Sequence, residues 1–203
     1  FAEALKKPEF EEEARFLAAE AYIKDGDTAK ATATLEGAIR ANASGPSVLR
    51  ASINLVDLHI ANEQFDQAVS MLRQLEGSAG YPDIIVTVNH RFVQIGDRHL
   101  DAQAYAAALA AYSAVRPRNQ VIAIQTARLA EMRRLKEDYD KRIAAATKAR
   151  KPLPRGTEDK AAMLAAMIEN TDKILGEVRT LADYDANLQY RIGRCYFNME
   201  RYW

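Results

Sequence analysis

Three stretches of this chain repeat one spacing of small and large apolar residues. Residues 23–39, 60–76 and 100–116 each contain a polar turn, then an alanine, a large apolar residue four positions later and another apolar residue three positions after that. The aligned positions are Ala31, Ala68 and Ala108, then Leu35, Leu72 and Tyr112, then Ala38, Leu75 and Val115. The alanines lie 37 and 40 residues apart. A repeat of this length predicts stacked units that bury their apolar faces against one another.

The residues that precede these stretches also share a pattern. Two adjacent small or apolar residues are followed three positions later by a tyrosine or histidine. The residues are Ala18, Ala19 and Tyr22, then Leu55, Val56 and His59, then Ile95, Gly96 and His99. Elsewhere the apolar residues recur every three or four positions, which places them on one face of a helix. The one β-branched run, residues 84–88, leads into such a pattern. We interpret it as the buried start of a helix, with a short strand as the alternative, and expect an all-α chain of about eight or nine helices.

Turn signals separate the predicted helices. Glycine supplies a positive φ at helix ends, and proline cannot continue a helix. These signals lie at residues 24–27, 42–46, 77–82, 116–119 and 151–156. Glycine and proline are otherwise scarce, with 9 and 6 residues, so the elements between the turns are expected to be long and uninterrupted.

The repeated positions resemble the tetratricopeptide repeat, a helix–turn–helix unit of about 34 residues. The resemblance covers residues 10–117 and resumes at 187–203. It implies an α-solenoid, a right-handed superhelix of antiparallel helix pairs that forms one continuous domain. Residues 1–117 would form three degenerate pairs, and residues 183–203 the first helix of a further, truncated repeat. In each pair, small residues let the two helix backbones approach while large residues fill the remaining space.

A long helical hairpin is predicted at residues 118–182, between the third pair and the last helix. Its first arm, about 50 Å long, has apolar residues at Leu129, Met132, Leu135, Tyr139, Ile143 and Ala146. Its second arm has a near-heptad seam at Leu164, Met167, Thr171, Ile174, Val178 and Leu181. A parallel, dimerising coiled coil is the alternative. The short loop at 151–156 favours antiparallel neighbours.

The resemblance also implies a binding groove, because the first helix of each unit in this family lines a concave surface that holds peptides. The groove positions are Glu13, Phe16 and Glu20, then Arg50, Ile53 and Asp57, then His90, Val93 and Asp97, and in the last helix Asn187, Tyr190 and Arg194. Family members that hold a peptide carboxylate use Lys and Asn at such positions. Here Glu20, Asp57 and Asp97 would repel a carboxylate. We therefore expect a ligand with basic or neutral polar groups beside an apolar anchor.

One segment has a marked charge asymmetry. Residues 141–155 contain six basic side chains and no acid: Lys141, Arg142, Lys148, Arg150, Lys151 and Arg155. This segment falls at the tip of the predicted hairpin. One interpretation is a solvated loop with cations near a helix C-terminus. The other is a docking surface for an acidic partner or an anionic surface. No aromatic residue interleaves the run, which argues against a platform for stacking nucleic-acid bases.

No residue pattern indicates catalysis or a cofactor. The sequence has no nucleophile–base motif and no glycine-rich phosphate loop. His59 and His99 share one repeat position. One hypothesis is that the two histidines bind a metal ion, and the other is that each replaces the packed tyrosine found there in the first unit. The single cysteine, Cys195, excludes an internal disulfide and is expected to be a buried apolar residue. We expect no metal and no cofactor.

These observations favour a non-catalytic scaffold that binds a protein or peptide partner. The alternatives are a structural or oligomerisation segment, and a helper region of a larger protein whose active module lies elsewhere. The net charge of +0 gives no general reason to expect nucleic acid as a partner. No apolar run reaches the roughly 18 residues of a membrane span. The compartment is left open.

The last residues, 190–203, align with the first helix of a repeat. Ile192 and Gly193 take the positions of Ile95 and Gly96, and Tyr196 takes that of Tyr22. The packing alanine of the second helix would come after Trp203. We therefore expect the natural protein to continue with more repeats, and the uncovered end to be the site of any homo-oligomer.

Overall fold

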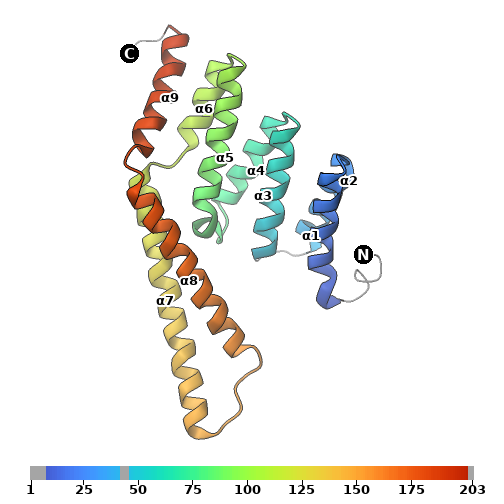
Figure 1. The fold of residues 1–203 in the computed structure, drawn as a ribbon, viewed down its shortest axis with the longest axis vertical. Coiled ribbons are helices and arrows are strands. Elements are labelled where there is room, and N and C mark those ends of the chain that lie inside the picture. Colours follow the sequence, from blue (N-terminus) through green and yellow to red (C-terminus); the bar gives the residue numbers. More distant parts are fainter. Residues whose placement is uncertain (1–7, 42–45, 201–203) are drawn as a thin grey trace. The chain divides into compact units, whose positions relative to one another are not determined.

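The computed structural model describes residues 8–41 and 46–200, with side chains from Ala14 onward except that of Pro46. The helices are α1 (Pro8–Lys24), α2 (Thr28–Ala41), α3 (Pro46–Ala61), α4 (Phe65–Glu76), α5 (Tyr81–Asp101), α6 (Tyr105–Ala114), α7 (Arg118–Ala149), α8 (Thr157–Thr180) and α9 (Tyr184–Asn198) (Figure 1). These described ranges contain no strand, which confirms the all-α prediction. Residues 84–88 lie inside α5, so the strand alternative is wrong. The turn expected at 42–46 falls largely outside the described residues.

The chain divides into two compact units. One holds α1 to α6 together with the end of α9 from Cys195, and the other holds residues 116–194. Each unit has buried residues of its own, so each is described by itself.

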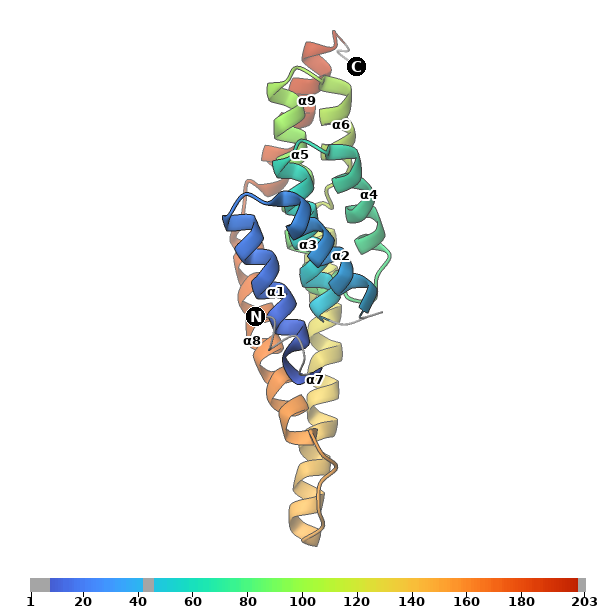
Figure 2. The ribbon, with the colours of Figure 1, turned by 90° about the vertical axis from the view of Figure 1, so that its right-hand side faces the viewer.

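The first unit consists of three antiparallel helix pairs, α1–α2, α3–α4 and α5–α6. Each helix contacts the next along the chain, and α3 also contacts α5. Figure 2 shows α1, α3 and α5 on one side of this unit and α2, α4 and α6 on the other. All nine residues that the repeat pattern aligned, from Ala31 to Val115, are buried. The same positions therefore supply the core of every pair.

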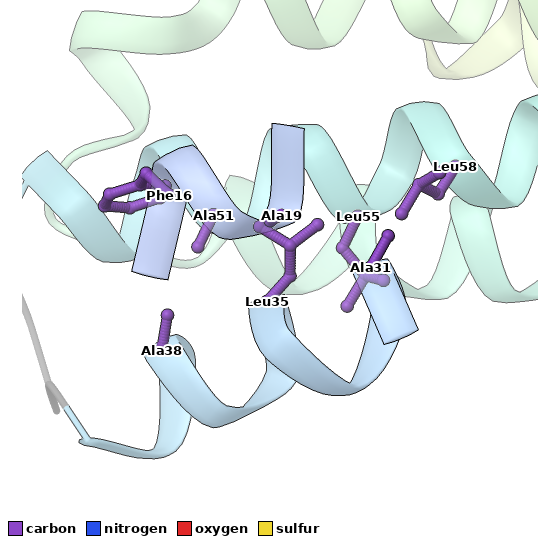
Figure 3. Packing of buried hydrophobic residues seen from close by; sticks show 8 residues of the cluster. All are labelled: Phe16, Ala19, Ala31, Leu35, Ala38, Ala51, Leu55 and Leu58. Carbon is purple, nitrogen blue, oxygen red and sulfur yellow. The ribbon is translucent and has the colours of Figure 1, made fainter. Parts of the chain in front are cut away.

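A buried cluster in the first two pairs illustrates this packing (Figure 3). Leu35 and Ala31 of α2 are directed toward α1 and α3, and both are 0% exposed. They meet Ala19 of α1, also 0% exposed, and Leu55 of α3. Small residues at Ala19 and Ala31 leave the space that Leu35 fills.

One backbone turn recurs at the same repeat position. Gly26, Glu63 and Gln103 have φ values of 75°, 59° and 57°, in the left-handed region. At Glu63 the N–H donates to Ile60 O at 3.1 Å, and the next N–H donates to His59 O at 2.8 Å. The same two bonds form at Gly26 and Gln103, which makes all three turns Schellman caps. Glu200, with φ of 56°, repeats the first bond after α9.

The second unit is built on α7 and α8, which lie side by side and antiparallel (Figures 1 and 2). The core between them contains Leu129, Met132, Leu164 and Leu175. Three apolar positions differ from the predicted seams. Leu135 is 38% exposed, Leu181 is 52% exposed and follows the end of α8, and Leu175 rather than Ile174 is fully buried.

Arg118 closes the base of this hairpin. Its guanidinium donates hydrogen bonds to Val178 O, at 2.9 Å, and to Arg179 O, which are carbonyls of the last turn of α8. Its backbone N–H donates to Asp185 Oδ1 at 2.9 Å. A cation on the last carbonyls of a helix also interacts favourably with the helix dipole. Arg118 therefore joins the start of α7 to the end of α8.

Candidate interaction surfaces

The predicted groove positions of the first unit lie on α1, α3 and α5. Glu20, Ile53, Asp57, Val93 and Asp97 are half-buried. Arg50 and His90 are exposed. Phe16 is only 3% exposed and belongs to the buried cluster, so its ring contributes to the core rather than to an accessible surface. The side chain of Glu13 lies outside the described residues.

Two of the groove carboxylates form ion pairs with arginines of the next first helix. Arg91 of α5 binds Asp57 of α3 through two hydrogen bonds, Nε to Oδ1 at 2.6 Å and Nη2 to Oδ2 at 2.9 Å. Arg50 of α3 donates to Glu20 of α1 at 3.1 Å, and its guanidinium lies 4.8 Å from the centroid of the Phe16 ring. These pairs connect α1 to α3 and α3 to α5.

The third carboxylate has a partner within its own helix pair. Tyr112 of α6 donates its hydroxyl proton to Asp97 Oδ1 at 2.6 Å. The uniform acidic stripe expected from Glu20, Asp57 and Asp97 is therefore corrected to a row of partnered carboxylates. The sequence argument did not use Arg91, which lies 34 residues after Asp57 and is close to it only because first helices stack one repeat apart.

The groove positions on α9 belong to the second unit. Asn187, Tyr190 and Arg194 are exposed, with Tyr190 at 66%. The Arg194 guanidinium lies 6.0 Å from the centroid of the Tyr190 ring.

Two aromatic side chains of α9, Tyr190 and Phe197, are also exposed. Phe197 is 66% exposed, whereas Leu100, at the same repeat position, is 7% exposed. A Cβ added at Gly193 would have nothing within 4 Å, but one added at Gly96 would meet the Tyr112 ring. Gly193 and Phe197 of α9 are thus less closely surrounded than Gly96 and Leu100 of α5.

The predicted basic tip falls at the end of α7 and in the loop before α8. All six cations are exposed. Lys141 binds Glu137 at 2.7 Å and Arg142 binds Asp138 at 2.8 Å, both one helical turn back. The hydrogen bond between Lys141 and Glu137 lowers the pKa of Glu137 and raises that of Lys141. Over the described residues, Lys148, Arg150, Lys151 and Arg155 have no ion pair.

The loop of the tip borders a small open hollow of about 200 Å³, lined by residues 153–159. Glu158 and Asp159 contribute acids to this lining at the N-terminus of α8. Those acids already complement the positive end of the helix dipole, so the hollow is not built for an anion.

The remaining candidates for chemistry are packed side chains. His59 Nδ1 lies 2.7 Å from Gln64 Oε1, and the His99 ring packs edge-on against Phe65, with centroids 4.6 Å apart. Cys195 is 0% exposed. Residues 8–41 and 46–200 contain no group of three or more His, Cys, Asp or Glu side chains that could hold a metal ion. No helix in these ranges is long and apolar enough to cross a membrane.

Comparison with known proteins gave no match among protein-family models, curated proteins or solved structures.

Proposed function

We propose that this chain is a non-catalytic scaffold of tetratricopeptide-like helix pairs that binds a protein or peptide partner. The observation that carries the proposal is the recurrence of one Schellman turn at Gly26, Glu63 and Gln103. Because the same turn ends each first helix, the three pairs repeat in backbone geometry as well as in buried residues. Stacked pairs expose a long continuous surface and need no catalytic centre.

The partner would bind along the first helices, α1, α3 and α5. The carboxylates of this face already bind Arg50, Arg91 and Tyr112. A basic ligand would have to break these pairs, so we favour a ligand with neutral polar groups. Ile53 and Val93 are the half-buried apolar side chains beside which its anchor would sit.

A peptide array tests this proposal. The wild-type chain should select peptides that join a large apolar residue to neutral polar ones, and the variant Ile53→Glu/Val93→Glu should lose at least about tenfold in affinity. The matched control is Val69→Glu/Leu109→Glu, which changes half-buried apolar residues on the second helices α4 and α6. Preference for acidic C-termini, or equal losses in the two variants, would contradict a groove on the first helices.

A second candidate function is self-association through α9, favoured by the exposure of Tyr190 and Phe197 at 66% each. The occupant of this face would be a second copy of the chain. Light scattering should then show oligomers that Tyr190→Ser/Phe197→Ser converts to monomers. Met163→Ser, at a 52% exposed apolar residue of α8, is the control and should leave the oligomers intact. A monomeric wild-type chain would eliminate this candidate.

A further inference from the structure

Four of the six cations of the basic tip have no ion pair with an acid in the described part of the chain. Along α7, Arg128 binds Glu131, Arg133 binds Asp172 and Lys136 binds Asp140. The pairing continues through Lys141 and Arg142 and then stops. The next four cations, Lys148, Arg150, Lys151 and Arg155, are exposed and unpaired in the described part of the chain.

Helix capping accounts for only part of this group. A cation stabilises a helix C-terminus within about the last turn. Lys148 lies in the last turn of α7, and Arg150 directly follows the helix. Lys151 and Arg155 lie in the loop before α8, beyond the last turn of α7. The loop therefore carries more positive charge than the capping of α7 accounts for.

The backbone that carries these cations is held in place. Arg150 has φ of 49°, and its N–H donates to Thr147 O at 3.2 Å. The Lys151 N–H donates to Ala146 O at 3.0 Å, which completes a Schellman cap. At the other end of the loop, the Thr157 hydroxyl donates to Pro154 O at 2.6 Å. A loop whose backbone is already ordered loses less conformational entropy when it binds.

The surroundings of the four cations indicate which kind of anion they fit. The loop has no aromatic residue for stacking on bases, and Leu153, its one large aliphatic residue, is half-buried rather than free to enter a lipid layer. Arginine binds carboxylates through two parallel hydrogen bonds, and two of the four cations are arginines. We infer that the four unpaired cations of the basic tip, Lys148, Arg150, Lys151 and Arg155, form a docking surface for an acidic polypeptide segment rich in Asp and Glu.

This inference does not depend on the groove, and direct binding tests it. The probe is a fluorescently labelled peptide of about ten glutamates, followed by anisotropy at about 20 mM and about 300 mM salt. The tip variant is Lys148→Gln/Arg150→Asn/Lys151→Gln/Arg155→Gln, in which asparagine tolerates the left-handed conformation of residue 150. The control variant, Lys24→Gln/Arg98→Gln/Arg134→Gln/Lys173→Gln, removes the same charge from exposed cations elsewhere.

The wild-type chain should bind the peptide at low salt and release it at high salt. The tip variant should lose at least about tenfold in affinity, while the control variant should stay within about twofold. Equal losses in both variants, or no binding by the wild-type chain, would overturn the inference. So would tighter binding of phosphatidylserine vesicles or duplex DNA than of the peptide. The groove variant Ile53→Glu/Val93→Glu should bind the peptide normally, which separates failure of this inference from failure of the proposed function.

Discussion

The ring of Tyr112 lies against the backbone of Gly96, so that a Cβ added at Gly96 would come within 2.4 Å of Tyr112 Cε1. The ring is 0% exposed, and its hydroxyl binds Asp97 at 2.6 Å. One tyrosine of α6 thus sets the close approach of α5 and α6 and also holds a carboxylate of the candidate groove.

Replacing Gly96 with alanine should destabilise the chain by up to about 2 kcal/mol. The clash with an immobile ring costs about 1–3 kcal/mol, which outweighs the gain of about 1 kcal/mol from the helix propensity of alanine. Gly37→Ala is the matched control, because a Cβ there would have nothing within 4 Å. It should stabilise the chain by about 0.5–1 kcal/mol. Urea unfolding measures both, and effects of the same sign would contradict the steric argument.

Replacing Gln103 with glycine should stabilise the chain by about 0.5–1 kcal/mol. Gln103 is held at a φ of 57°, where a side chain is strained and glycine is not. Gly26→Ala, the reverse change at the equivalent turn, should destabilise by about 1 kcal/mol. Thermal unfolding followed by circular dichroism should show melting temperatures that move in opposite directions. A lower melting temperature for Gln103→Gly would show that its side chain makes a contact more important than the strain.

The sequence predicted the helices and turns well. The spacing of apolar residues and the positions of glycine and proline both determine structure within a few neighbouring residues. The sequence placed Ile174 rather than Leu175 in the core of the hairpin, which is wrong, because adjacent apolar residues fit a helical period almost equally. It also could not show that Arg91 neutralises Asp57 or that Phe16 is buried beneath Arg50. Those contacts depend on how neighbouring helices cross, which the spacing within one helix does not contain.

Removing the side chain of Arg118 should destabilise the hairpin. Arg118→Ala deletes two charge-assisted hydrogen bonds to the last carbonyls of α8 and should cost about 1–2 kcal/mol. Arg118→Lys keeps the charge but lacks the guanidinium that donates both hydrogen bonds. It should therefore retain only part of the stability that Arg118→Ala loses. Arg134→Ala, at an exposed residue of α7, is the control. Hydrogen exchange of the α8 amides measures the effect, and equal protection in Arg118→Ala and the control would contradict it.

Acid should weaken the start of α2 through Asp27. Hydrogen bonds from the Lys30 side chain and from the Lys30 N–H lower the pKa of Asp27. A carboxyl whose pKa is lower in the folded state stabilises that state above its unfolded pKa of about 3.9, and the stabilisation is lost as the pH falls through the folded value. Melting temperatures between pH 7 and 2 should therefore fall less in Asp27→Asn than in the wild type. Parallel curves would exclude this contribution.

The cations of residues 141–155 also alter how the whole chain behaves as an electrolyte. Residues 141–155 hold six of the 28 basic residues and no acid, so the rest of the chain has 22 basic and 28 acidic residues, a formal charge of −6 within a total of +0. A chain with such segregated charge has one positive segment and an otherwise negative surface, although its net charge is zero. Its copies should attract one another most strongly near the isoelectric point of about 7.0 and at low ionic strength. Added salt should therefore raise its solubility, and at high protein concentration its own acidic residues should compete with any acidic partner for the tip.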